Sequence, residues 1–157
     1  MSKLARTMYE EHLQMQPTEV VYKAVIPLNP VPKKNSQQIV KNRYTGKPML
    51  IQSDNHKKYI KQAFVFLTNR PRTPIDYPIN LCYRFYRDSD RAVDESNLVE
   101  CIDDLLTNCG VIADDNFRIV VGHDGTRVMV DRDNPRTEII IQKMEVQNNG
   151  NADRLQG

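Results

Sequence analysis

The chain has 157 residues, of which 27% are charged, and its formal net charge is only +2. This length fits one compact domain that buries roughly two thirds of its unfolded surface. No run of about 18 apolar residues is present, which excludes a transmembrane helix. Residues 1–6 lack the apolar segment of a signal peptide, so we expect no export signal at this end.

The predicted elements of the first half follow from β-branched runs, proline spacing and helical periodicity. In chain order they are a short helix over residues 3–14, a strand over 20–26, a stiff proline-rich loop over 27–36, strands over 37–41 and 48–51 around a turn, and a helix from Ser53 or Asp54 to about residue 69. The expected buried residues of this helix are Tyr59, Ile60, Ala63, Phe64 and Leu67.

The second half begins with an alternating strand over residues 79–86. A second helix is predicted from its apolar stripe, which consists of Leu98, Ile102, Leu105, Leu106 and Cys109, and Gly110 stands where such a helix ends. Further strands are predicted over residues 117–121, 127–131 and 136–141. Hairpins mixed with two main helices favour a single two-layer α+β domain with a mixed β-sheet.

We assign this domain to residues 18–145. Residues 1–17 form an N-terminal extension that includes the short helix, and residues 146–157 are predicted to be a disordered polar tail. The three cysteines, Cys82, Cys101 and Cys109, have apolar neighbours and no metal-ligand spacing, which indicates reduced core thiols in a cytoplasmic protein.

The charges are divided into two regions of opposite sign. Residues 88–115 contain nine acidic residues and one arginine, whereas residues 31–72 contain ten Lys or Arg and one aspartate. Carboxylates gathered beside a broad basic surface suggest divalent cations that act on a phosphodiester backbone.

The acidic residues lie at both ends of the second predicted helix. Asp94 precedes the helix, and Asp114 and Asp115 follow it after a short return, so a strand–helix–strand arrangement can bring these carboxylates together. Such oxygen ligands suit the one or two Mg²⁺ ions that phosphodiester hydrolysis uses to generate hydroxide and to neutralise charge.

Three polar residues share one face of this helix, because Asn97, Glu100 and Asp104 are spaced at i, i+3 and i+7. The alternative interpretation is that the acids are solvated and cap the helix. In that interpretation Asn97 and Glu100 form a capping box, and Asp94 also helps to cap the helix.

The acidic segment resembles the RusA family of Holliday-junction resolvases, which are bacterial and prophage enzymes with the signature D-x-D-N-L-x-K, then D-x-L, then G and finally D-D. The matching positions, without gaps, are Asp94, Asn97, Leu98, Asp104, Leu106, Gly110, Asp114 and Asp115. Residues 30–36 resemble the N-terminal Pro/Lys loop of the family, and residues 135–141 resemble its closing strand.

The resemblance implies a RusA-like homodimer that uses Mg²⁺ or Mn²⁺ to resolve four-way DNA junctions by symmetric phosphodiester hydrolysis. It implies that Asp94, Asp114 and Asp115 are catalytic metal ligands, with Asn97 and Asp104 in supporting roles. A two-fold symmetric substrate that needs two nicks also favours two active sites. The expected location is a bacterial cytosol, with a bacterial or phage gene, and we expect neither an organic cofactor nor a membrane.

Two positions depart from the signature. Ser96 stands at the second aspartate, and Glu100 stands at the lysine of the first helical turn. Because the number of carboxylates is kept, we expect Glu100 to be the fourth catalytic residue and metal ligand, while Arg91 or Arg118 are candidates to replace the lysine. One alternative is a catalytically degenerate relative that binds junctions without cutting them. Another is an interaction domain that binds no nucleic acid.

The basic residues are expected to bind DNA phosphates. They are distributed over a loop, a hairpin and a helix face, which suits contacts with the DNA backbone more than a single base-reading helix. The candidates are Lys33, Lys34, Lys41, Arg43, Lys47, Lys57, Lys58 and Lys61. Tyr44 at the hairpin tip is either a base-stacking or a packing residue. The three histidines, His12, His56 and His123, are expected to be surface or turn residues.

Overall fold

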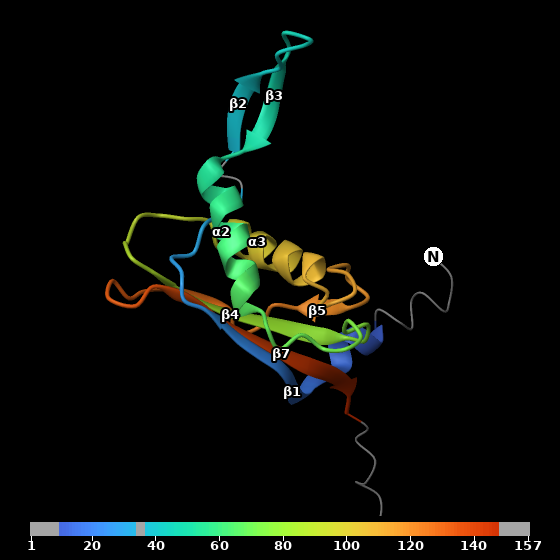
Figure 1. Cartoon of the computed structure of the whole chain (residues 1–157). Coiled ribbons are helices and arrows are strands. Elements are labelled where there is room, and N and C mark those ends of the chain that lie inside the picture. Colours follow the sequence, from blue (N-terminus) through green and yellow to red (C-terminus); the bar gives the residue numbers. More distant parts are fainter. Residues whose placement is uncertain (1–9, 34–36, 148–157) are drawn as a thin grey trace, which may run out of the picture.

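The structure is a computed structural model that describes residues 10–33 and 37–147. Residues 10–14 are helical. The elements that follow are β1 (Met15–Ile26), β2 (Gln37–Lys41), β3 (Pro48–Gln52), α2 (Asp54–Phe66), β4 (Ile79–Arg87), α3 (Glu95–Asn108), β5 (Val120–Gly122), β6 (Arg127–Val130) and β7 (Arg136–Val146). Within these residues, α2 and α3 cover one face of a mixed five-stranded sheet, and β2 and β3 form a separate hairpin (Figure 1). The predicted α+β domain is therefore confirmed.

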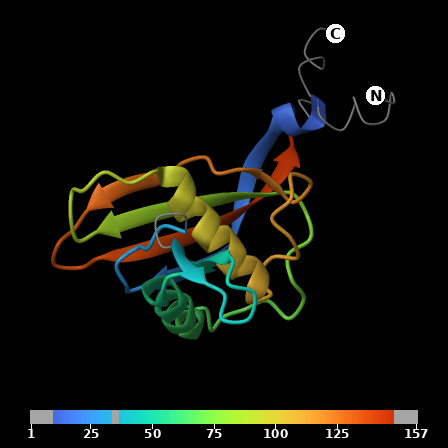
Figure 2. The same ribbon diagram turned by 90° about the horizontal axis from the view of Figure 1, so that it is seen from above.

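The sheet is built around the antiparallel strands β1, β7 and β4. Their register aligns buried side chains in rows across the three strands, and one such row contains Tyr22, Ile141 and Leu81. Strand alternation turns these rows toward the helices. Seen from above, α3 lies diagonally over the sheet and α2 stands almost end-on beside it (Figure 2).

Both predicted helices form, and their limits have local causes. Ser53 is the N-cap of α2, because its Oγ accepts a hydrogen bond of 3.2 Å from the backbone N–H of His56. The helix ends at Phe66, three residues before the predicted end. Of its expected buried residues, Tyr59, Ala63 and Leu67 are in the core, whereas Phe64 is exposed. Every residue of the predicted apolar stripe of α3 is buried.

The strands differ from the prediction at the starts of β1 and β5. β1 begins at Met15, inside the segment assigned to the N-terminal extension, because it continues its ladder with β7 as far as Val146. β5 begins at Val120 rather than at residue 117, since Asn116 starts a turn whose carbonyl accepts the backbone N–H of Val120. β5 and β6 do not pair with each other, because both pair in parallel with β4 along the same edge. The disordered tail was predicted over residues 146–157, but Val146 is the last residue of β7, and residues 148–157 lie outside the described residues.

The hairpin projects from the domain as an arm (Figure 1). Strand β3 ends at Gln52 and α2 begins at Asp54, so a single residue separates the hairpin from the helix. The hairpin turn contains Gly46, whose φ of +70° suits glycine. Several apolar side chains of the arm face solvent, among them Ile39 and Leu50. The hairpin therefore extends outward directly from the N-terminus of α2, while α2 itself is packed in the domain.

Two glycines give a test of this fold. Gly110 has φ +74° and open space where a Cβ would lie, so Gly110→Ala should cost only backbone strain, about 1 kcal/mol of unfolding free energy. Gly125 has φ +86°, and its Cβ would lie 3.1 Å from Sγ of Cys82, so Gly125→Ala should cost clearly more. Urea unfolding of both variants measures the difference. Equal losses would contradict the placement of the β5–β6 turn against β4.

Candidate active site

The N-terminus of α3 is built around Asp94, which is the N-cap of the helix. Its backbone carbonyl accepts the N–H of Asn97 at 3.1 Å, but its side chain makes no capping hydrogen bond. The carboxylate instead accepts a bond of 3.4 Å from the buried amide of Asn97. The capping-box interpretation is therefore wrong, because the helix begins before Asn97, and the Asp94 carboxylate is exposed beside the helix end.

The return of the chain after α3 places Asp114 and Asp115 in an exposed loop. Asp114 accepts hydrogen bonds of 2.8 Å from the side chain of Asn116 and from the backbone N–H of Asp115, and these bonds lower the pKa of Asp114. Burial raises the pKa of Asp115, and the hydrogen bond with Asp114 and the charges of Asp103 and Asp104 add to this. Two adjacent aspartates therefore have opposite environments, and Asp115 lies in the negative field of α3.

A buried polar cluster next to this loop was missed by the sequence interpretation. The hydroxyl of Tyr83 donates a 2.6 Å hydrogen bond to Asp103, and Nε2 of His123 lies 2.9 Å from the same carboxylate. Burial raises the pKa of Tyr83 well above its ordinary value, and the charges of Asp103 and then Asp115 add to the effect. The sequence does show a tyrosine in a predicted strand and an aspartate on the buried side of the next predicted helix. It does not show that the two side chains meet, because the position of the helix over the strand cannot be read from the sequence.

Lys33 connects the proline-rich loop to the face of α3 that the sequence predicted. Its backbone N–H donates to the carbonyl of Asn97 at 3.1 Å, and Nζ lies 3.2 Å from Oε1 of Glu100 and 2.5 Å from Oδ2 of Asp104. The hydrogen bond with Asp104 raises the pKa of Lys33, and the bond with Glu100 acts in the same direction. Glu100 and Asp104 therefore lie on one face of α3, where the same ammonium contacts both. Asn97 does not share this face with its side chain, because Lys33 contacts only its backbone carbonyl and the side chain is buried.

The other basic candidates lie on the projecting arm. Lys41, Arg43 and Lys47 are exposed on the hairpin, and Tyr44 at its tip is 98% exposed, which excludes the packing role in this chain. The exposed lysines of α2 continue this surface along the helix; they are Lys57, Lys58 and Lys61. Lys34 lies outside the described residues.

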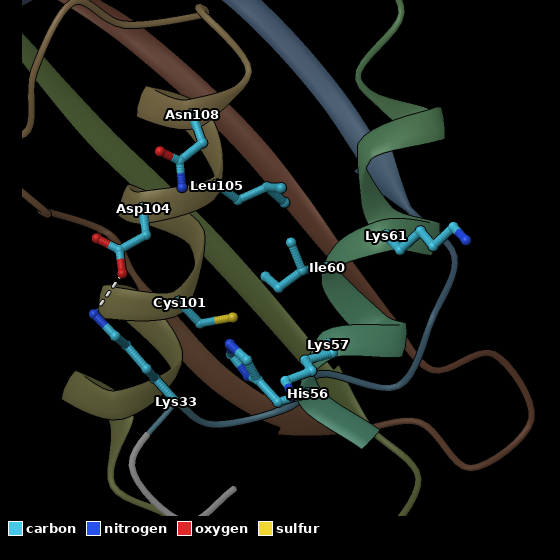
Figure 3. Close-up of a pocket in the computed structure, with 9 residues that line it drawn as sticks. All are labelled: Lys33, His56, Lys57, Ile60, Lys61, Cys101, Asp104, Leu105 and Asn108. Atoms are coloured by element: carbon cyan, nitrogen blue, oxygen red, sulfur yellow. Dashed lines mark hydrogen bonds and ion pairs between the residues drawn. The ribbon is translucent and has the colours of Figure 1, made fainter. Parts of the chain in front are cut away.

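One histidine differs from the prediction. His56 is buried on the inner side of α2, where its ring faces α3 (Figure 3). Burial lowers the pKa of His56, and the neighbouring charge of Lys33 adds to this. The surface interpretation of this residue is therefore wrong, since the first turn of α2 points inward over the Pro/Lys loop.

Comparison with known proteins adds no family assignment, since no protein-family model matches the chain and no curated protein matches it significantly. In the described part of the chain, no group of three or more His, Cys, Asp or Glu side chains is arranged to hold a metal ion. The same residues contain no helix that is both long and apolar enough to cross a membrane.

The two neighbouring aspartates lead to opposite stability predictions. Asp115→Asn should raise the unfolding free energy at pH 7, because the folded state raises the pKa of Asp115 and so penalises its ionised form. The gain should disappear as the pH falls below the ordinary value of 3.8, where the carboxyl is protonated in both states. Urea unfolding at neutral and acidic pH measures this effect.

Asp114→Asn is the matched control. The folded state lowers the pKa of Asp114, so its ionised form stabilises the fold above pH 3.8, and the amide also loses one acceptor oxygen. This variant should therefore be less stable than the wild type at pH 7. A stability loss in both variants would contradict the opposite environments of the two carboxylates.

Proposed function

We propose that the protein is a Mg²⁺-dependent endonuclease that resolves four-way DNA junctions. The observation that carries the proposal is the acidic environment of Asp115 in the exposed return loop, where burial, the hydrogen bond with Asp114 and the charges of Asp103 and Asp104 all raise the pKa of Asp115. Repelling carboxylates of this kind are relieved when a cation binds between them. The order and spacing of Asp94, Asp114 and Asp115 in the sequence support the same chemistry.

The donor set fits a hard divalent cation, because every candidate ligand supplies carboxylate oxygen. Asp94, Asp114 and Asp115 would hold the ion, and Glu100 is the fourth candidate. When bound, Mg²⁺ or Mn²⁺ activates a water molecule and neutralises charge on the phosphodiester. Asp94 is exposed at the start of α3, Glu100 is half-exposed within the helix, and Asp114 and Asp115 are exposed in the loop that follows it, where a DNA strand would have access.

Lys33 supplies the cationic group of this proposed site. The family that the acidic segment resembles has a lysine in the first turn of this helix, at the position of Glu100 in this chain. Glu100 forms an ion pair with Nζ of Lys33. The charge at this place is therefore restored from a different part of the chain. Neither Arg91 nor Arg118, the two candidates from the sequence, is needed for this role.

The arm supports the DNA-binding part of the proposal. Its exposed lysines and Arg43 form a basic projection that extends away from the acidic residues (Figure 1). Lysines spread over two elements contact phosphates without reading sequence. Tyr44 at the tip has the exposure that stacking on an open base requires. A homodimer would present two such arms and two sites to a two-fold symmetric junction.

The second candidate function is a junction-binding protein of the same fold that does not cut. The pairing of Glu100 with Lys33 favours it, because a carboxylate neutralised by an ammonium is a poorer metal ligand. Ser96 at the position of an expected ligand favours it as well. Both candidates share the basic arm, so only a cleavage assay separates them.

Asp94→Asn and Asp115→Asn should each abolish cleavage of a labelled four-way junction in Mg²⁺. Junction binding should stay equal or become tighter, since each change removes a negative charge near the DNA backbone. Denaturing gels measure the cuts, and mobility shifts in Ca²⁺ or EDTA measure binding. Because Asp115→Asn should be more stable than the wild type, its loss of activity cannot come from unfolding. Cleavage at the wild-type rate would remove that carboxylate from the site.

Glu100→Gln decides between the two functions of this residue. If Glu100 holds the metal, cleavage should fall by at least about a hundredfold while the protein stays folded. Adding Ser96→Asp to this variant should restore activity, because it returns a carboxylate to the first turn of α3. Normal cleavage by folded Glu100→Gln would limit Glu100 to positioning Lys33. The non-cutting function would be established if the wild type binds junctions without cutting them and the double variant Ser96→Asp/Glu100→Lys cuts them.

A further inference from the structure

A cavity of about 410 Å³ lies between α2 and α3, and neither Asp94 nor Asp115 lines it. Figure 3 shows that its walls come from facing sides of the two helices, with Ile60 on one side and Leu105 and Cys101 on the other. Lys33, Lys57 and Lys61 also line it, against the single carboxylate of Asp104. Its volume falls within the roughly 300–1,000 Å³ of small-molecule sites.

His56 gives this cavity a polar group without a partner. The side chain is 6% exposed, and its buried Nδ1 forms no hydrogen bond with any residue in the ranges 10–33 and 37–147. Buried ring nitrogens are almost always hydrogen-bonded in folded proteins. The ring lines the cavity and is turned toward Cys101 in Figure 3. Because Nδ1 has almost no accessible surface, a ligand in the cavity can supply the missing partner only after a small rotation of the ring.

The chemistry of the walls selects a ligand with two different ends. Ile60 forms the apolar wall on the α2 side, and Leu105 and Cys101, each only 1% exposed, close the cavity on the α3 side, so the space between the helices suits a flat, uncharged group. Lys57 and Lys61 are four residues apart on α2 and lie on one ridge of the helix, where two ammonium groups can bind one phosphate. Asn108 adds an amide that can pair with the edge of a base.

We propose that this cavity binds a single nucleotide, with the base between Ile60 and Leu105, a base polar atom on Nδ1 of His56, and the phosphate on Lys57 and Lys61. Two sources can supply it, a free nucleotide or an unpaired nucleotide at the branch of a DNA substrate. The second source rests on the proposed function, because it needs a protein that binds branched DNA. The cavity lies beside the base of the arm, so a strand that follows the arm reaches it.

The first experiment titrates the full chain with dAMP and dTMP, and with inorganic phosphate as a control for charge alone. Lys57→Ala and Ile60→Trp should each weaken nucleotide binding at least roughly tenfold, since one removes the phosphate contact and the other fills the base site. Lys58→Ala is the matched control, because Lys58 has the same charge but lines a different pocket with Leu28 and Tyr59. Thermal unfolding of each variant verifies that the fold is intact.

The second experiment compares a fully paired four-way junction with the same junction carrying one unpaired nucleotide at its centre. Wild type should prefer the unpaired form, and the preference should be lost in Lys57→Ala and Ile60→Trp but kept in Lys58→Ala. Both lysine variants should lose similar affinity for the fully paired junction, since each removes one phosphate-attracting charge. Nucleotide binding without this preference identifies the free nucleotide as the ligand, and the preference without nucleotide binding identifies the DNA strand.

The inference is overturned if Ile60→Trp changes neither measurement, or if dAMP and dTMP bind no better than phosphate while the two junctions bind alike. Failure of the proposed function has a different signature. In that case the wild type neither cuts nor binds a four-way junction. The nucleotide affinity in the titration still depends on Lys57 and Ile60.

Discussion

Burial of the apolar side of α3 against the sheet fixes the orientation of the acidic side chains that α3 carries. Leu98, Ile102 and Leu105 are each 1% exposed, and burying side chains of this size contributes roughly 2–3 kcal/mol apiece. Because successive helical residues are rotated by about 100°, this burial sends the adjacent Asp103 and Asp104 in different directions. Asp103 turns inward to Tyr83 and His123, and Asp104 turns outward to Lys33.

The two charged regions of the chain meet at Lys33. Its contacts with Glu100 and Asp104 are partly exposed, and exposed ion pairs contribute only about 0–1 kcal/mol of stability. Their effect is therefore positional. Together with the backbone hydrogen bond to Asn97, these contacts hold the proline-rich loop against the start of α3. They also place the positive charge of Lys33 next to the acidic residues of α3.

Local features of the sequence were sufficient to predict much of the fold. The apolar stripe of α3, the Ser53 cap and the positive φ of Gly110 depend on neighbours within one or two helical turns, and each is confirmed. The parallel pairing of β5 and β6 with β4 was not predicted, because both strands are short and their partner lies some forty residues earlier. For the same reason, contacts between distant segments were missed, such as Lys33 with Glu100 and the burial of His56 against α3.

The proposed activity sets two electrostatic requirements that oppose each other, and the structure meets them in separate places. A metal site needs several carboxylates, yet their field repels the DNA backbone that the ion must reach. At physiological ionic strength this repulsion is screened beyond about 8 Å, so attraction must act at close contact. The arm carries lysines outward from the domain while the acids stay at α3 and its return loop (Figure 1). In the proposed activity, DNA held by the arm would therefore approach the acids with part of its charge already neutralised, and a bound cation would offset the remainder.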